Sequence, residues 1–223
     1  MKRPLLCTTV SAKDCGEMAR KARLAISMGS DLVELRLDHL MTPEAEKVGA
    51  ALSDVVPKSV LTNRPTGEGG RFRGNDEERL QLLGELAQLS PAFLDIELEL
   101  AWNNPGFTRS LNVRRILSWH DFEGTPPLSE LSAKARDALS LGDIAKIVTT
   151  AKRPEDVGRV LSLYRSFEPA RLVAFSMGEA GVSSRAEAIR FGSPLAYCSL
   201  DSGPVAPGQL PFAEMRDLLR SSQ

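Results

Sequence analysis

The sequence predicts an α/β fold, a (β/α)₈ barrel that forms a single domain from residue 1 to residue 223. Two observations predict it. Short apolar runs rich in β-branched residues recur eight times along the 223 residues, and segments with a helical spacing of apolar residues lie between them. Eight βα units in a chain of this length are near the lower size limit of such a barrel. The pattern therefore favours a closed parallel sheet with helices outside it.

The strands are expected at 5–10 (LLCTTV), 31–38 (DLVELRLD), 58–64 (KSVLTNR), 93–99 (FLDIELE), 114–122 (RRILSWHDF), 143–150 (DIAKIVTT), 171–177 (RLVAFSM) and 195–200 (LAYCSL). Helices are expected between and after them, with the weakest helical pattern in AWNNPGFTRSLN, 101–112. Helix starts are signalled by prolines 43 and 154, and helix ends by glycines 29, 142 and 192. A doubly wound open sheet is the alternative, but it commonly has fewer strands, and the GxGxxG fingerprint of its nucleotide-binding forms does not follow the first strand.

The composition narrows the class of partner. The charges nearly cancel, with 28 Lys and Arg against 29 Asp and Glu, so the broad basic surface that nucleic acid or an anionic membrane requires is excluded and a small-molecule partner is expected.

The three cysteines, Cys7, Cys15 and Cys198, are odd in number and lack CxxC spacing, which argues against a disulfide framework or a zinc site and favours buried apolar positions. No stretch is long enough for a signal peptide core or for the roughly 20 apolar residues of a membrane span. We therefore expect a soluble, cytoplasmic protein.

Several predicted strands carry charged side chains on one face, although the strands of a parallel sheet are normally apolar throughout. In DLVELRLD, for example, the charged residues alternate with aliphatic ones, and strand side chains alternate between faces with period two. The polar side chains grouped in this way are Glu34, Arg36, Asp38, Thr62, Arg64, Asp95, Glu97, Glu99, Ser118 and His120. Lys146, inside the apolar run DIAKIV, joins them.

Burying these polar strand faces costs less free energy if they point into the barrel than if they point outward. Facing outward they would meet apolar helices and cost several kcal/mol each without water. At the C-terminal mouth of the barrel they can pair with one another and with a polar ligand. A passive ion-pair network that plugs the barrel is the alternative for any single carboxylate, but five strands with polar residues at one height favour a site.

Lys146 and His120 point to a class of reaction. A free lysine has a pKa of about 10.4, and desolvation or neighbouring positive charge lowers a lysine's pKa toward the neutral amine that attacks carbonyls. A lysine whose head reaches solvent is the alternative, but the position in mid-strand favours Schiff-base chemistry. His120 ends the fifth strand and can take and return a proton, whereas His39 is expected in a loop. The implied reaction is proton abstraction beside a carbonyl, followed by elimination or carbon–carbon cleavage.

Eight stretches, in this order, resemble those of the type I 3-dehydroquinate dehydratases, the Schiff-base enzymes of the shikimate pathway. They are DLVELRLDHL, LTNRPTGEGGRF, DIELE, SWHDFEGTP, DIAKIV, AFSMGEAGVSSR, FGSPLAY and APGQLP. Each alone is a modest signal, but together they are specific and cover the chain from the first strand to the end. The resemblance implies dehydration of 3-dehydroquinate to 3-dehydroshikimate in the aromatic amino acid pathway, without a cofactor, by a homodimer. No metal is expected either, because the two histidines lack HxH or HExxH spacing.

The resemblance also implies roles for single residues. Lys146 forms an iminium with the substrate ketone, His120 removes the neighbouring proton and protonates the departing hydroxyl, and Glu97 orients His120. Arg185 holds the substrate carboxylate by a two-pronged contact. The other expected contacts are Glu34, Arg36 and Arg64 around the hydroxyls and the lysine, Gln209 on a hydroxyl, and Met177, Phe175 and Tyr197 as apolar walls.

The loop DSGPVAPGQLP, residues 201–211, is expected to act as a lid that brings Gln209 to the substrate, with a rigid surface connection as the alternative. The chain departs from the family at Val205, where many relatives have serine, and at Asn63, where a bulkier residue is common. Both changes are expected to affect binding more than chemistry. Two other functions stay open: a class I aldolase, which also uses a barrel lysine, and a barrel that binds a small acid without catalysis.

Overall fold

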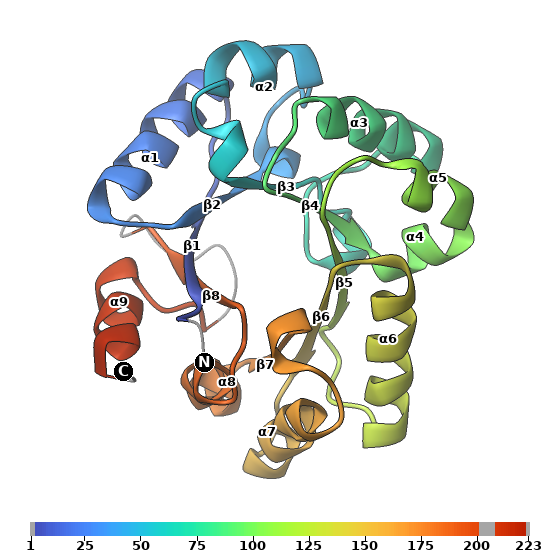
Figure 1. Ribbon diagram of the computed structural model, residues 1–223, viewed down its shortest axis with the longest axis vertical. Helices are drawn as coiled ribbons and strands as arrows, with labels where there is room; N and C mark the ends of the chain where they lie inside the picture. The colour runs from blue at the N-terminus through green and yellow to red at the C-terminus, as the bar shows by residue number, and fades with distance from the viewer. Residues whose placement is uncertain (1–2, 201–207, 222–223) are drawn as a thin grey trace.

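The computed structural model describes residues 3–200 and 208–221, and in it one parallel sheet curls into a barrel surrounded by helices (Figure 1). The strands are β1 (Leu5–Val10), β2 (Leu32–Arg36), β3 (Ser59–Thr62), β4 (Phe93–Glu97), β5 (Arg115–Asp121), β6 (Ile144–Thr150), β7 (Leu172–Met177) and β8 (Leu195–Ser199). Hydrogen bonds join them in the order β7-β6-β5-β4-β3-β2-β1-β8. The predicted (β/α)₈ barrel is confirmed.

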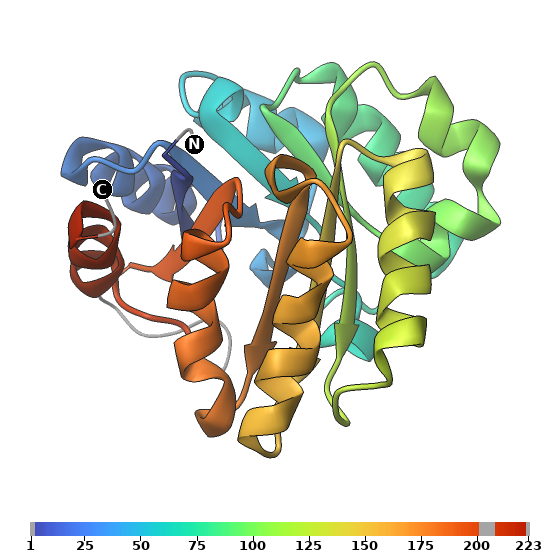
Figure 2. The same cartoon turned by 60° about the horizontal axis from the view of Figure 1, so that its bottom comes forward.

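The helices lie outside the sheet, and Figure 2 shows α6, α7 and α8 side by side against it. Their bounds are α1 (Cys15–Met28), α2 (Ala45–Leu52), α3 (Asp76–Gln88), α4 (Leu98–Asn103), α5 (Pro105–Ser110), α6 (Leu128–Leu141), α7 (Pro154–Leu161), α8 (Val182–Arg190) and α9 (Phe212–Ser221). The weak helical pattern of the fourth connection corresponds to two helices of six residues, α4 and α5. No helix among residues 3–200 and 208–221 is both long and apolar enough to cross a membrane.

Most of the predicted helix boundaries match the structure. Gly29 closes α1 in the left-handed region at φ 109°, where a side chain would be strained, and Pro154 is the first residue of α7. The expected start after residue 42 is wrong. Glu44 still has extended backbone, with φ −123° and ψ 127°, so α2 begins only at Ala45.

Besides β3, which stops at Thr62 instead of residue 64, two strands end two residues earlier than the sequence pattern predicts. β2 stops at Arg36, and Leu37–His39 form a short 3₁₀ turn, so Asp38 leaves the strand. β4 stops at Glu97, and Glu99 lies exposed in α4 instead of on the polar strand face. Both changes happen at the C-terminal end of a strand, where the chain turns into the next connection.

The polar faces of the strands point into the barrel, and the apolar faces pack against the helices. Strand register places Thr9 beside Glu34, Thr62 beside Asp95, and Ser118 beside Lys146, and all six side chains are buried. The large apolar core contains the alternating aliphatic residues of the strands together with the inner faces of the helices. Cys7 and Cys198 are buried as expected, while Cys15 is half-buried. The alternation therefore divides each strand between a polar interior and an apolar exterior.

The barrel has a seam at β7, because no ladder joins β7 to β8 among the described residues. At this edge of β7, side-chain hydroxyls accept backbone hydrogen bonds that a neighbouring strand would otherwise accept. Tyr164 Oη accepts a hydrogen bond from Ala174 N at 2.9 Å, and Ser184 Oγ accepts one from Ser176 N at 2.8 Å. Ala174 and Ser176 are two residues apart, so their backbone groups face the same edge of β7. Buried amides at this edge are thus satisfied without β8.

We expect Tyr164→Phe to lower the free energy of unfolding by about 1–3 kcal/mol, because it leaves the buried Ala174 amide without an acceptor. Urea unfolding measures this loss. Ser162→Ala is the matched control, since it removes a hydroxyl that bonds only its own helix, at Gly158 O, and should change stability by less than about 0.5 kcal/mol. An equally small change for Tyr164→Phe would show that the seam does not depend on this hydroxyl.

Candidate active site

Lys146 lies in the middle of β6, on the inner face of the barrel, and is 5% exposed. Its Nζ is 3.3 Å from Glu34 Oε1 and 3.3 Å from Asp95 Oδ2. The ammonium also sits 4.3 Å from the centre of the Tyr197 ring, within reach of a cation–π interaction. The charged groups nearest to the ammonium are thus carboxylates, not the neighbouring positive charge considered from the sequence. These partners are what allow an ammonium to be buried in an apolar strand.

The two carboxylates are themselves held in place. Asp95 Oδ1 accepts hydrogen bonds from Arg64 Nη2 at 2.7 Å and from Ser118 Oγ at 2.6 Å. Burial opposes ionisation of Asp95, but Arg64 and Lys146 outweigh it and hold the pKa of this carboxyl below its ordinary value. Asp95 is therefore a fixed anion beneath the lysine, a position that sequence reasoning saw only as part of a polar face.

Glu34 completes the surroundings of Lys146. Its carboxylate accepts hydrogen bonds from Thr9 Oγ1 at 2.9 Å and from Thr62 Oγ1 at 3.2 Å. Burial again opposes ionisation, but Lys146 and Arg36 keep the pKa of Glu34 below its ordinary value. Both anions thus stay charged, and neither can rotate freely away from the lysine.

His120 lies near the end of β5, with its Nδ1 2.9 Å from Glu68 Oε2. Glu68 ends the 3₁₀ turn Thr66–Glu68, which folds back over the barrel mouth because two glycines follow it. Gly69 has φ 73°, and a Cβ on Gly70 would lie 2.0 Å from the carbonyl oxygen of Arg64. The glycines of the GEGG stretch therefore place the Glu68 carboxylate against the imidazole.

Glu97 does not hold His120, so the expected contact is wrong. Its Oε1 accepts a hydrogen bond from Arg64 Nη1 at 2.8 Å, and its Oε2 accepts one from Arg79 Nη2. Two guanidinium groups bind a carboxylate more strongly than a neutral imidazole does. Glu97, the last residue of β4, thus binds Arg64 and Arg79. Glu68, not Glu97, makes the contact with His120.

The His120–Glu68 pair has unusual ionisation. Burial, with help from Arg64 and Lys146, holds the pKa of His120 well below its ordinary value, so the imidazole is neutral near pH 7. Burial raises the pKa of Glu68 to about 7, although Arg64 opposes the rise. The carboxyl therefore changes charge at neutral pH beside an imidazole that does not, and its state decides which ring nitrogen carries the proton.

These groups line one open cavity, in which the empty space amounts to about 630 Å³ when the solvent at its mouth is included. Ten of the eleven predicted site residues border it, and Glu97 does not. The bordering residues are Lys146, His120, Glu34, Arg36, Arg64, Arg185, Gln209, Met177, Phe175 and Tyr197, joined by Thr9, Glu68, Gly69, Phe122 and Val148. The lining thus combines an amine, a neutral imidazole, three guanidiniums and an apolar wall.

The guanidiniums and the amide on the walls suit a hydroxylated anion. Arg36 is held by Asp38 through two hydrogen bonds of 2.9 and 2.8 Å. The Arg185 guanidinium lies 4.2 Å from the centre of the Phe175 ring, and burial lowers its pKa to about 10, so it stays charged at neutral pH. Gln209 Nε2 donates to Thr9 Oγ1 at 2.9 Å. Fixed cations around a partly apolar cavity are the arrangement that binds a small carboxylic acid.

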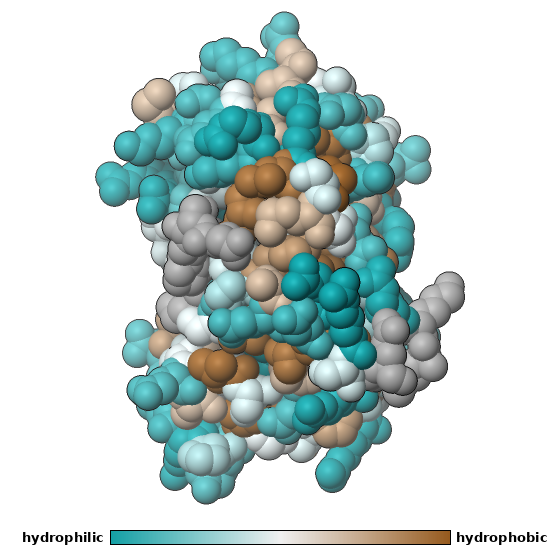
Figure 3. Space-filling view, turned by 90° about the vertical axis from the view of Figure 1, so that its left-hand side faces the viewer, coloured by the Kyte–Doolittle hydropathy of each residue, from teal (hydrophilic) through white to brown (hydrophobic). Residues whose placement is uncertain are grey.

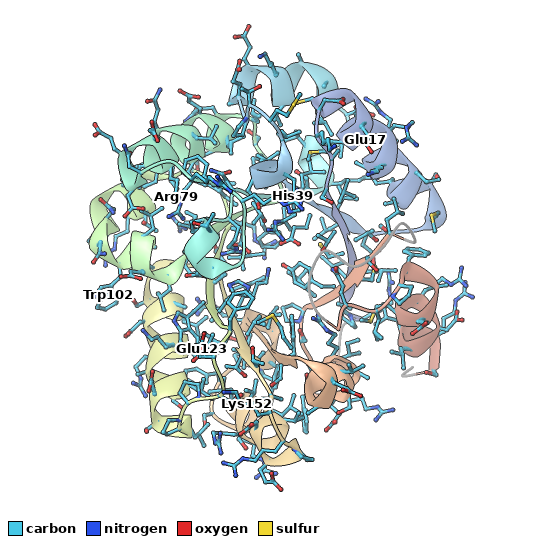
Figure 4. The ribbon with its side chains drawn as sticks, turned by 180° about the vertical axis from the view of Figure 1, so that it is seen from behind. Glu17, His39, Arg79, Trp102, Glu123 and Lys152 are labelled. Carbon is cyan, nitrogen blue, oxygen red and sulfur yellow. The ribbon has the colours of Figure 1, made fainter. Side chains whose placement is uncertain are left out.

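Three other predictions from the sequence concern residues that are not among those described around the cavity. Residues 201–207, which carry Val205 and most of the expected lid, lie outside the described residues. Asn63, one residue after β3, is 2% exposed and does not border the cavity, whereas the next residue, Arg64, does. His39 lies in the turn after β2, as expected, and burial lowers its pKa to about 4 (Figure 4).

Comparison with known proteins agrees with this geometry. Residues 6–223 match the model of the family described as type I 3-dehydroquinase. The chain belongs to the type I 3-dehydroquinase family. It is 38% identical over 208 residues to the 3-dehydroquinate dehydratase of Desulfotalea psychrophila, covering 90% of each chain. It is 35% identical over 214 residues to that of Methanothermobacter thermautotrophicus, covering 96% of this chain and 95% of the relative.

Solved structures of two 3-dehydroquinate dehydratases share the fold. The crystal structure of 3-dehydroquinate dehydratase from Geobacillus kaustophilus superposes with a TM-score of 0.86 and 28% identity, over 98% of this chain and 90% of that one. That from Aquifex aeolicus superposes with a TM-score of 0.82 and 32% identity, over 97% and 98% of the chains. The barrel and its order of elements are therefore those of the family.

We expect the Glu68 carboxyl to titrate with a midpoint of about 7 in ¹³C NMR spectra of the protein, because its burial disfavours the charged form. The sign is fixed by the direction of the shift, since a raised pKa keeps the carboxyl protonated below pH 7 and charged only above it. Glu68→Gln identifies the signal by removing it. A midpoint near that of a free glutamate, about 4.3, would contradict the geometry of the pair.

Proposed function

We propose that this chain dehydrates 3-dehydroquinate to 3-dehydroshikimate through an imine between Lys146 and the ring ketone of the substrate. The single observation that carries the proposal is that the Lys146 amine and the His120–Glu68 pair line the same cavity. Family membership and the printed name of the relatives, 3-dehydroquinate dehydratase, support the same reaction. A class I aldolase would share the lysine, but the family match favours the dehydratase.

Imine formation begins at Lys146. The amine, once it has lost its extra proton, adds to the carbonyl carbon, and the carbonyl oxygen leaves as water. The resulting iminium keeps the positive charge that the ammonium had, so Glu34 and Asp95, both anionic, stabilise it in the same place. The barrel interior is therefore complementary to the cationic intermediate as well as to the free lysine.

His120 then moves the proton. Charged Glu68 accepts the hydrogen on Nδ1, which leaves the Nε2 lone pair free to take the proton from the carbon next to the iminium. The electrons of the broken C–H bond pass into the iminium and give an enamine. The enamine expels the hydroxyl, which His120 protonates to water, and hydrolysis of the remaining imine frees Lys146. One imidazole thus serves as base and then as acid.

The walls of the cavity hold the substrate. We assign the substrate carboxylate to Arg185 and the ring hydroxyls to Arg36 and Gln209, while Phe175 and Met177 provide apolar contact. Arg64 borders the cavity too, but its donors already bind Asp95, Glu97 and Ser118. We therefore assign Arg64 to the charge around the lysine rather than to a hydroxyl.

We also propose that residues 1–223 act as one catalytic domain, in the cytoplasm, as a homodimer. The match to the family over residues 6–223 supports the single domain. Apolar side chains gather on the face that carries α1 and α9 (Figure 3), and Leu24 of α1 is 46% exposed. An apolar area of this kind is a common feature of an interface with a second copy.

Lys146→Met is expected to abolish turnover, because no amine remains to form the imine, and His120→Ala is expected to reduce kcat by about 10²–10⁴-fold. The absorbance of the conjugated enone product measures both. Lys152→Met is the matched control, since Lys152 follows the same strand but is exposed. Turnover that survives in Lys146→Met would refute the imine, and unchanged rates in His120→Ala would remove its role.

A further inference from the structure

Arg79 is an arginine of α3, outside the strands, that reaches inward to the barrel (Figure 4). It is 5% exposed, although an arginine is rarely buried without a partner. Its guanidinium binds Glu97 through Nη2 and the exposed Asp76 through Nη1 at 3.1 Å. Arg79 does not border the cavity. A buried helix cation that contacts a barrel carboxylate, but not the substrate space, has no part in the chemistry described above.

Glu97 connects Arg79 to the centre of the site. The two oxygens of its carboxylate are divided between Arg79 and Arg64. Arg64 in turn donates to Asp95, the anion beside Lys146, and its Nη1 lies 3.6 Å from Glu68 Oε2. Glu97 and Arg64 therefore lie between Arg79 and the His120–Glu68 pair, and Asp95 follows Arg64 on the way to Lys146.

The charges in this row alternate, so each group depends on the next. Without Arg79, Glu97 keeps a full negative charge with Arg64 as its remaining guanidinium partner. It then competes with Asp95 and Glu68 for the same cation, because Coulomb attraction at hydrogen-bond distance is strong in a buried environment. Any displacement of Arg64 toward Glu97 changes the position of Asp95 under Lys146 and the field on Glu68.

We propose that Arg79 is a positioning residue for the dehydration, which by holding Glu97 fixes Arg64 between Asp95 and Glu68. The inference rests on the proposed function, since it concerns the same cavity and reaction. It assigns to α3 a part in the site that no strand pattern indicates. Arg79 acts through Glu97 and Arg64 and touches neither the substrate nor the lysine.

The inference has an electrostatic consequence at Glu68. The charged and titratable groups that act on this carboxyl come from five elements, namely Arg64 after β3, Arg79 of α3, Asp95 of β4, Glu99 of α4 and His120 of β5. Burial raises the pKa of Glu68, and the Arg79 cation opposes the rise. Loss of the cation should therefore raise the pKa of Glu68 further. Loss of the Glu97 anion should lower this pKa indirectly, because it frees Arg64 to interact more strongly with Glu68.

The test compares Arg79→Gln, Arg79→Lys and Glu97→Gln by steady-state kinetics from pH 5.5 to pH 9. Since kcat/KM needs charged Glu68, it rises with pH through the pKa of that carboxyl in the free enzyme. We expect Arg79→Gln to move this midpoint up by about half a unit to one unit, and Glu97→Gln to move it down. At pH 8 we expect kcat of Arg79→Gln to fall about tenfold and KM to change less than about twofold. Arg79→Lys, which keeps the charge, should restore most of kcat and the midpoint.

Arg159→Gln is the control for a merely structural loss. Arg159 of α7 is also partly buried and also binds an aspartate of its own helix, Asp156, together with Thr125 O. This variant should lower the melting temperature without moving the midpoint. If Arg79→Gln does not fold, Glu97→Gln tests the same link from its other end, with the opposite direction of shift.

Two outcomes would overturn the inference. One is an unchanged midpoint and kcat in Arg79→Gln with active wild-type protein, and the other is a shift in the same direction for Arg79→Gln and Glu97→Gln. Failure of the proposed function looks different, because then the wild-type protein itself would not turn over 3-dehydroquinate. The two failures are therefore distinguishable in one set of assays.

Discussion

The charged side chains around the site depend on the burial of one ammonium group, that of Lys146. Lys146 stands in an otherwise apolar strand, and a buried cation is tolerated only where anions meet it. Glu34 and Asp95 do so at 3.3 Å, and each is in turn held by hydroxyl or guanidinium donors from neighbouring strands. The polar interior of the barrel follows from this requirement, because every charge added to hold the lysine needs a partner of its own.

Arg64 interacts with the anions beside both the lysine and the histidine, namely Asp95 and Glu68. Its guanidinium holds Asp95 and Glu97 and lies near Glu68, so one side chain affects both the surroundings of Lys146 and the His120–Glu68 pair. The burial that keeps His120 neutral also keeps Glu68 poised near pH 7. Electrostatic pre-organisation of this kind requires rigid supports, and here these supports extend outward as far as α3.

The sequence predicted the fold from eight strand-like runs with helical patterns between them, and it predicted the charged part of the cavity from period-two alternation along strands. The remaining walls, namely Arg185, Gln209, Met177, Phe175 and Tyr197, were predicted from the family resemblance. Alternation placed Lys146, Glu34 and His120 inside the barrel, and the structure places them there. Glu68 was missed because it lies in a loop, where no periodicity operates and only the glycines of GEGG signal a tight turn. Glu97 was assigned to His120 by the family resemblance, because a strand pattern gives the face of a residue but not its partner. Arg79, which binds Glu97, comes from the helix before β4, where no strand alternation signals an inward contact.

In the proposed reaction, the amine held between Glu34 and Asp95 is the group that bonds to the substrate. Borohydride reduces an imine to a stable amine, so adding it during turnover of 3-dehydroquinate fixes any covalent intermediate. Mass spectrometry of the digested protein should then find the added mass on the peptide that contains Lys146 and on no other lysine. An adduct on a different residue, or none at all from protein that is turning over substrate, would contradict the account.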